Sequence, residues 1–369
     1  MKFSTYVIFF LLFGVLPDLY IGMGTGLEPV WKGILMLPTL AALVSLVFIG
    51  LGKWYTDALR VFSYLIFIFE LPKFVFMLFS PLGTAGIVVG VAVALFFAIL
   101  IFYSSRHLKV NTETLYFQNL PSAFIGLKIC QLSDLHLGSF GRKAKYVQKV
   151  IDKTLEQNPD IILFTGDLVN FASAEALPYR EQLARLKAPM GIFAIRGNHD
   201  YLLHGCFNEE ERQKDTDRLL SFEQELGWNV LMDQHVILTK DKQEIAMAGV
   251  GNISTSPYFQ KMGGNMKKAL EGIPDGTFTI LMSHDPSHWK AQVVPETDIP
   301  LTLSGHTHGL KYKLAGPHPS HWKLHQSSGL YSAGEQLLYV SKGLGSAFAF
   351  RLGGYPRIDI LTLTNTKTN

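Results

Sequence analysis

Four long apolar segments fill the first hundred residues of the chain, and charged positions are rare among them. Each segment is about 20 residues long, close to the length that an α-helix needs to cross a bilayer. A cleavable signal peptide followed by buried core helices would explain the first segment, but not four in succession. The pattern therefore predicts an all-α bundle of four transmembrane helices, at residues 6–23, 31–51, 61–79 and 85–103.

The third apolar segment contains the ionisable residues Glu70 and Lys73, with Pro72 between them. Side chains three positions apart share one face of a helix, so these two can form an ion pair. Ionisable groups at bilayer depth are costly and are often functional. Two interpretations follow: Pro72 kinks the helix and the pair stabilises the break, or the pair takes part in substrate access.

From residue 127 onward, short apolar runs alternate with amphipathic stretches, which is typical of an α/β domain. The early runs are almost continuously apolar, which favours sheets covered on both faces. We therefore expect a transmembrane region at 1–103, a connector at 104–126 with a strand at 114–118, and an α/β domain at 127–369. The predicted strands of this domain are 127–133, 161–165, 192–195, 245–250, 278–282, 301–303, 337–340 and 358–363, and its predicted helices are 143–157, 175–186, 209–226 and 266–270.

Charge is distributed unevenly between these regions. The 369 residues include 33 Lys and Arg and 30 Asp and Glu, but only nine of these charged residues lie in residues 1–103. The net charge of +3 gives no reason to expect a nucleic-acid partner. Of the two cysteines, Cys130 lies in a predicted buried strand and Cys206 in a loop, so we expect no disulfide. No feature of the sequence specifies an oligomeric state.

Basic residues in the short loops indicate the orientation of the bundle, because cytoplasmic loops are enriched in Lys and Arg. One side of the bundle carries five such residues, whereas the opposite side carries only Lys32. We therefore expect both termini and the large domain to lie on the cytoplasmic side of the cell (inner) membrane. The basic residues on that side are Lys2, Lys53, Arg60, Arg106 and Lys109.

Side chains with metal-binding chemistry follow five of the predicted strands. Asp134 and His136 come after the first strand, and we expect them to share a face because alternate residues of an extended strand point the same way. In open α/β sheets, ligands bind outside the carboxyl ends of the strands, so all five sets are expected to converge. The later sets are Asp167, Asn198 with His199, His284, and His306 with His308.

This donor set contains carboxylate, imidazole and amide groups but no thiolate, which suits Mn²⁺, Fe²⁺ or Fe³⁺, or Zn²⁺. Seven ligands are too many for one ion. They suit two divalent metal ions about 4 Å apart that share one carboxylate, an arrangement that clamps both ends of a phosphoryl displacement. A single strand-end Asp or His is more often a turn residue, so it is the joint pattern that favours a metal site.

The order of these motifs resembles that of the calcineurin-like metallophosphoesterases. The resemblance covers residues 125–363, about two thirds of the chain, and the apolar N-terminus is similar to that of bacterial membrane-anchored members. It implies two β-sheets packed face to face with helices outside, an αββα sandwich. The motifs read Asp134-Leu135-His136, Gly166-Asp167, Gly197-Asn198-His199-Asp200, His284 and Gly305-His306-Thr307-His308.

The resemblance also implies a role for each site residue. Asp167 would bridge the two metals. His199 would face the phosphate, where it would protonate the leaving oxygen or stabilise the transition state, and Asp200 would orient His199. The remaining ligands would be Asp134, His136 and His308 for one metal, and Asn198, His284 and His306 for the other.

The implied activity is hydrolysis of a phosphodiester or pyrophosphate bond by a metal-bridging hydroxide. Because the bundle would anchor the enzyme in the bilayer, we expect the phosphate-ester substrate to belong to a lipid head group. Soluble nucleotides are the alternative substrate. The alternative functions are a metal-binding membrane sensor without turnover, and a transporter with an attached domain.

Three features near the C-terminus bear on the substrate. Membrane-associated relatives often continue with Gly-Gln after the last motif, whereas this chain has Leu310-Lys311, which affects the expected substrate preference but no metal ligand. The run 343–345 and Arg351 resemble a family tail in which backbone amides and an Arg meet phosphate, although Arg351 also suits a solvated surface position. The segment 312–332, rich in aromatics and His, is expected to form either a cap over the site or an ordinary β-hairpin.

Overall fold

The computed structural model describes residues 3–52, 54–103, 107–141, 144–201, 208–256, 262–309, 326–346 and 354–366. These residues form two compact units, one before and one after residues 104–106. Some positions named above lie outside the described residues: Lys2, Lys53, Arg106, Cys206, Leu310, Lys311, Arg351 and the segment 312–325.

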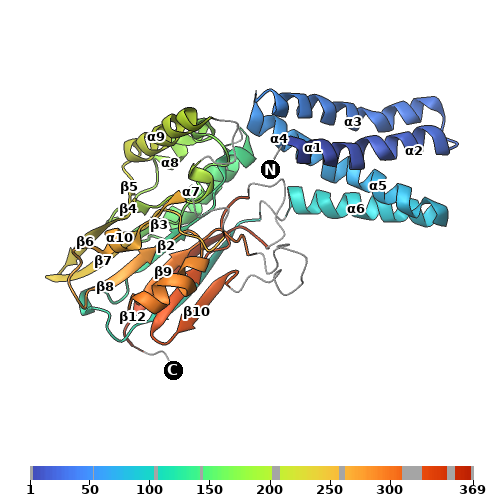
Figure 1. Ribbon diagram of the computed structural model, residues 1–369. Coiled ribbons are helices and arrows are strands. Elements are labelled where there is room, and N and C mark those ends of the chain that lie inside the picture. Colours follow the sequence, from blue (N-terminus) through green and yellow to red (C-terminus); the bar gives the residue numbers. More distant parts are fainter. Residues whose placement is uncertain are drawn as a thin grey trace. The chain divides into compact units, whose positions relative to one another are not determined.

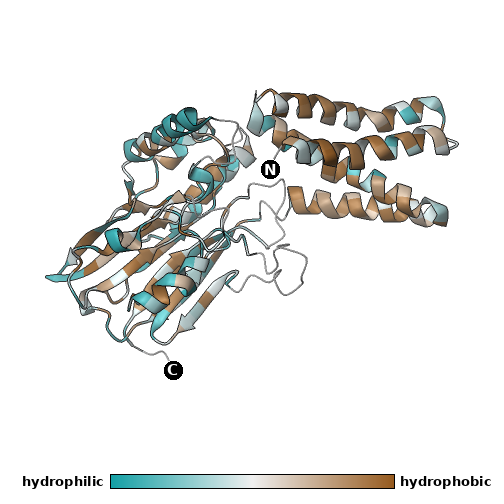
Figure 2. Ribbon diagram, viewed as in Figure 1, coloured by the Kyte–Doolittle hydropathy of each residue, from teal (hydrophilic) through white to brown (hydrophobic). Residues whose placement is uncertain are grey.

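The first unit consists of apolar helices, and within its described residues four of them are long and apolar enough to cross a membrane, as the sequence predicts. Figure 2 shows that hydrophobic residues dominate these helices. The third span, Tyr55–Leu82, is longer at both ends than predicted. The spans are built from α1 (Phe3–Phe10), the π-helical turn η1 (Leu11–Val15) and α2 (Leu16–Gly24); α3 (Pro29–Gly50); α4 (Tyr55–Leu65), the π-helical turn η2 (Ile66–Glu70), α5 (Leu71–Phe79) and the short 3₁₀ turn η3 (Ser80–Leu82); and α6 (Thr84–Phe102).

A buried polar cluster joins three of these spans. Nζ of Lys73 lies 2.6 Å from Oε2 of Glu70 and 2.6 Å from Oδ1 of Asp18, and it donates a hydrogen bond of 2.8 Å to Oγ1 of Thr39. Glu70 and Lys73 thus form the expected ion pair, which extends to the first and second spans. The cluster lies beside Pro72 and the π-helical turn that ends at Glu70. Its position at a helix irregularity fits the interpretation that the pair stabilises a break.

The second unit contains two six-stranded sheets, with the strand orders β1-β12-β2-β3-β4-β5 and β10-β11-β9-β8-β7-β6. In the first sheet β2, β3 and β4 run parallel, and in the second β7, β8 and β9 do so. Each parallel set therefore has its carboxyl ends along one edge. The strands are β1 (Lys109–Tyr116), β2 (Lys128–Leu132), β3 (Ile161–Phe164), β4 (Ile192–Ala194), β5 (Asn229–Val230), β6 (Gln234–Lys240), β7 (Gln243–Gly249), β8 (Phe278–Met282), β9 (Leu301–Ser304), β10 (Gly329–Ala333), β11 (Gln336–Val340) and β12 (Arg357–Thr364).

Apolar side chains from both sheets form the central core, in which Ile129 and Leu163 of the first sheet pack with Ile280 and Leu303 of the second. A second core lies between the outer face of the first sheet and its helices, and a third covers the outer face of the second sheet. The layers are visible in Figure 1. This arrangement confirms the predicted sandwich of two sheets flanked by helices. The helices are α7 (Lys145–Glu156), α8 (Arg180–Leu183), α9 (Glu209–Glu225), α10 (Met266–Leu270) and α11 (Val294–Glu296).

Some elements differ from the sequence-based expectations. The helix predicted at 175–186 is broken into short turns and the four-residue α8, because Pro178 cannot donate the hydrogen bond that a continuous helix needs. Strand β6 was not predicted, and in the structure its positions are mostly half-buried without a regular alternation. The strand expected at 114–118 in the connector corresponds to β1, which begins earlier, at Lys109, and ends at Tyr116, and it pairs in parallel with β12. The end of the segment 312–332 forms β10, which pairs with β11 as an antiparallel hairpin.

Candidate metal centre

Five loops bring the predicted donors together at the carboxyl ends of β2, β3 and β4 in the first sheet and β8 and β9 in the second. Backbone hydrogen bonds fasten these loops to one another. The N–H of Asp134 donates to the carbonyl of Gly166 at 2.8 Å, and that of Gly305 donates to the carbonyl of His284 at 2.9 Å. Each sheet thus supports its own loops, and side-chain contacts join the two sets.

Most of the predicted donors lie on left-handed backbone. The φ angles are 51° at Asp134, 49° at His136, 59° at Asp167, 72° at His306 and 52° at His308. Such a conformation costs about 1–3 kcal/mol per residue, and residues that adopt it cluster at functional sites. The expected alternation along an extended strand is therefore wrong for the first pair. Strand β2 ends two residues before Asp134, and tight turns, rather than the pleat, aim the side chains.

A chain of contacts joins the donors of the two sheets. Nε2 of His308 lies 3.7 Å from Oδ1 of Asp134, and the ring centroids of His308 and His136 are 5.1 Å apart. Nε2 of His136 lies 3.5 Å from Oδ2 of Asp167, and Nε2 of His284 lies 3.2 Å from the same oxygen. Asp167 therefore lies between a histidine of the first sheet and a histidine of the second.

His306 completes this chain. Its backbone N–H donates to Oδ1 of Asp134 at 3.0 Å, and its Nδ1 lies 2.8 Å from Oδ1 of Asn198. Its ring centroid lies 5.2 Å from that of His284. The structure thus brings together all seven residues that the sequence predicts as metal ligands.

The donor atoms fall into three overlapping groups, in each of which the atoms lie within 4.8 Å of one another. Asp167 and His136 each belong to two groups, so the groups form one continuous cluster. The groups are Asp134, His136 and His308; His136, Asp167 and His199; and Asp167, His284 and His306.

The contacts of His284 show that this cluster suits a cation. Its Nδ1 lies 2.7 Å from the carbonyl oxygen of Thr165. A carbonyl only accepts, so Nδ1 carries the proton, and in the neutral ring Nε2 points a lone pair at the Asp167 carboxylate. Burial alone would lower the pKa of His284, but the charge of Asp167 raises it to about 10. The pocket therefore favours positive charge between these two side chains, and a divalent metal bound there would supply it.

The buried carboxylates lead to the same conclusion. Asp134 and Asp167 are almost completely buried. Burial raises the pKa of Asp134 to about 6. Burial would also raise the pKa of Asp167, but the nearby imidazoles of His284 and His199 hold it well below its usual range. Buried anionic oxygens that face imidazole nitrogens are a donor set suited to divalent metals.

His199 and Asp200 are held differently from the sequence-based expectation. Nδ1 of His199 lies 2.8 Å from the backbone carbonyl of Asn170, which fixes the ring. The Asp200 carboxylate instead accepts hydrogen bonds of 2.7–3.2 Å from four backbone N–H groups. Its contacts support a role in fixing the loop that carries Asp167 against the loop that carries His199, rather than in orienting His199 itself. The four donors are the N–H groups of Asp167, Leu168, Val169 and Gly197.

Glycines allow the loops to approach closely. A Cβ atom at Gly197 would lie 2.6 Å from Cε1 of His284. At Gly343 φ is +74°, and a Cβ atom would lie 2.7 Å from Cβ of Asp134. The N–H groups of Leu344 and Gly345 donate to the carbonyls of Ser133 and Asp134. The tail therefore supports the Asp134 loop, and these two amides do not face a phosphate as the sequence suggested.

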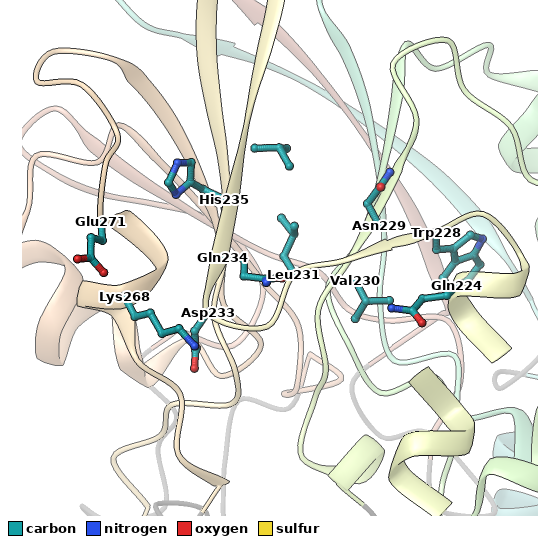
Figure 3. A pocket seen from close by; sticks show the side chains of 11 residues that line it. Gln224, Trp228, Asn229, Val230, Leu231, Asp233, Gln234, His235, Lys268 and Glu271 are labelled. Carbon is teal, nitrogen blue, oxygen red and sulfur yellow. The ribbon is translucent and has the colours of Figure 1, made fainter. Parts of the chain in front are cut away.

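A pocket of about 700 Å³ lies away from these donors, between the edge strands β5 and β6 (Figure 3). Its polar groups hold local structure. Asp233 accepts from the N–H groups of Gly251 and Asn265, and Nδ1 of His235 contacts the carbonyl of Ala269. None of the predicted site residues lines this pocket.

Comparison with known proteins identifies the family. A family model described as calcineurin-like phosphoesterase matches residues 127–310. The metallophosphoesterase YkuE of Bacillus subtilis is 30% identical over 278 residues, which are 72% of this chain and 88% of YkuE. The chain belongs to the calcineurin-like phosphoesterase family. It is a metal-dependent hydrolase of phosphate esters, as the motifs indicated.

Two other relatives in this family bear on the membrane and the substrate. UDP-2,3-diacylglucosamine pyrophosphatase LpxG of Chlamydia muridarum is 26% identical, over 66% of this chain and 86% of LpxG. A transmembrane protein with a metallophosphoesterase domain from Danio rerio is 28% identical, over 52% of this chain and 42% of that protein. Membrane helices and a phosphoesterase domain thus also occur together in a relative.

Proposed function

We propose that this phosphoesterase is anchored in the membrane and hydrolyses a phosphodiester or pyrophosphate bond at a centre of two divalent metals. The main support is the position of Asp167, whose Oδ2 lies 3.5 Å from Nε2 of His136 and 3.2 Å from Nε2 of His284, a histidine from each sheet. We propose that it bridges the metals. The other ligands would be Asp134, His136 and His308 for one metal, and Asn198, His284 and His306 for the other.

Two cations held by these residues would lower the pKa of a water molecule and neutralise charge on the phosphoryl oxygens. In this mechanism His199 acts as the general acid. Its Nδ1 contacts the carbonyl of Asn170, and Nε2 would be the nitrogen that donates a proton to the leaving oxygen. Asp200 keeps the loops of Asp167 and His199 in register through its backbone hydrogen bonds.

We further propose that the substrate is a phosphate in a lipid head group, in particular the pyrophosphate bond of a nucleotide linked to an acylated sugar. Four membrane helices would keep the enzyme beside such a substrate. The relative LpxG, named for cleavage of UDP-2,3-diacylglucosamine, supports the same substrate class.

Activity of the full chain in detergent with Mn²⁺ tests this substrate. We expect kcat/KM for UDP-2,3-diacylglucosamine to exceed that for UDP-N-acetylglucosamine by at least about tenfold, because each buried acyl CH₂ contributes about 0.8 kcal/mol to binding. Equal values, or a preference for the soluble nucleotide, would contradict the lipid substrate and favour the nucleotide alternative. A complete lack of turnover on both, and on an aryl phosphodiester, would favour a metal-binding sensor.

We also propose that the catalytic domain faces the cytoplasm from the inner membrane. The support is the distribution of Lys and Arg between the short loops. A periplasm-dependent alkaline phosphatase fused after Asn369 is expected to be inactive, and an active fusion would reverse the orientation.

A further inference from the structure

We propose that Asp285 is a positioning residue that holds the His306 ring through Nε2 and so directs Nδ1 of His306 toward the second metal. This inference rests on the proposed dinuclear function and deepens it. Asp285 lies directly after His284, but it belongs to none of the donor groups.

The two nitrogens of His306 face different partners. Nδ1 lies 2.8 Å from Oδ1 of Asn198, another predicted ligand of the same metal. Nε2 lies 3.7 Å from Oδ2 of Asp285, within the range of an ion pair but longer than a hydrogen bond. A histidine that ligates a metal commonly presents its other ring N–H to a carboxylate, which fixes the tautomer and the ring orientation. Asp285 is the carboxylate in that position here. With a metal bound, the ring proton would lie on Nε2 and face Asp285, and Nδ1 would present its lone pair to the ion instead of donating to Asn198.

The Asp285 carboxylate is itself held in place. Oδ2 accepts a hydrogen bond of 2.5 Å from Oγ of Ser254, and Oδ1 accepts one of 2.8 Å from the N–H of Ser287. The residue is only 6% exposed. Oδ1 therefore stabilises the local turn, whereas Oδ2 is the oxygen that faces His306. An Asn at this position can therefore keep an oxygen that accepts from the N–H of Ser287, while it replaces the oxygen that faces His306 with an amide NH₂ group.

Asp215 provides a matched control. It is also 6% exposed, and its carboxylate likewise accepts from one serine hydroxyl and one backbone N–H, both of Ser173 at 2.7 Å. Its cationic neighbour is the exposed Arg218 at 3.5 Å, not a histidine of the cluster. Asp215→Asn therefore removes a comparable buried charge without touching the site.

The test is a titration of metal-free, full-length protein in detergent with Mn²⁺, followed by calorimetry, together with thermal unfolding of the same metal-free samples. The wild type is expected to bind two Mn²⁺ per chain. Asp285→Asn is expected to weaken one of the two sites by about 10–100-fold, whereas Asp215→Asn keeps both. The metal-free Tm of Asp285→Asn is expected to match that of Asp215→Asn.

The outcomes separate the inference from the function on which it rests. Failure of the wild type to bind Mn²⁺ in stoichiometric amounts would overturn the proposed dinuclear function. Two other results would overturn only the role of Asp285. In the first, the wild type binds two Mn²⁺ and Asp285→Asn binds both with affinities within twofold of the wild-type values. In the second, both Asn variants lose the same amount of Mn²⁺ affinity. If Asp285→Asn does not fold, Ser254→Ala decides: a several-fold weaker site supports the role, and wild-type affinity overturns it.

Discussion

Replacement of Asp167 by Asn is expected to lower kcat by at least about 100-fold while the protein remains folded. Oδ2 of Asp167 lies 3.5 Å from Nε2 of His136 and 3.2 Å from Nε2 of His284, which supports the proposal that both metals share this carboxylate. Asn removes the charge and turns one oxygen into an N–H donor, which cannot bind a cation. Two-metal sites depend on such a shared ligand to clamp both ends of the displacement. Steady-state hydrolysis of an aryl phosphodiester with Mn²⁺ measures the effect.

The control for this substitution is Asp160→Asn. Asp160 directly precedes β3, at the end of the strand opposite to the donor cluster, and it accepts a hydrogen bond of 2.8 Å from the N–H of Lys128. Asp160→Asn should keep kcat near the wild-type value, apart from any loss of stability. If Asp167→Asn retains kcat within about tenfold of the wild type, Asp167 does not bridge two catalytic metals.

The second large effect is expected for His199→Gln, with a loss of about 10²–10⁴ in kcat. The loss should be largest for substrates with a poor leaving group and small for an aryl phosphodiester, because a good leaving group needs no proton. His235→Gln is the matched control. Its Nδ1 also contacts a backbone carbonyl, at 2.9 Å compared with 2.8 Å for His199, but it lies in the separate pocket of Figure 3.

Metal content distinguishes a general acid from a ligand in this experiment. His199 belongs to one donor group, with His136 and Asp167, so a role as ligand is a definite alternative. If His199 is the general acid, the His199→Gln variant is expected to keep two metals per chain. Loss of one metal in His199→Gln, with no dependence on the leaving group, would assign His199 to the metal shell instead.

The sequence contains enough information to place the donors at strand ends. The apolar runs that form β2, β3, β4, β8 and β9 are short, buried and bounded by glycine or polar residues, so their positions and carboxyl ends could be predicted. Parallel strands then bring those ends to one edge. The αββα fold followed from the same alternation together with the family resemblance.

The sequence could not give the backbone geometry that aims the donors. The strand rule predicts that Asp134 and His136 point alike because of the pleat, yet both have φ near +50° in a turn beyond β2. Left-handed conformations at non-glycine residues have no reliable local signal, because loop contacts impose them. Pro178, by contrast, was a visible signal that should have shortened the helix predicted at 175–186.

The motifs also could not predict which residues support the donors. Asp200 follows His199 in the sequence, which suggested that it orients His199, but its four backbone donors come from two loops. Asp285 faces His306, and Ser254 holds Asp285 from a third loop. Such contacts depend on how distant loops pack, and no spacing along the chain encodes them.

Anomalous X-ray diffraction from crystals of the full chain grown with Mn²⁺ tests the central claim most directly. The account predicts two manganese peaks about 3.5–4 Å apart, with an oxygen of Asp167 bound to both. One peak should also contact Asp134 and the other Asn198. A single peak, or two peaks of which one does not touch Asp167, would contradict the dinuclear centre on which the proposed function rests.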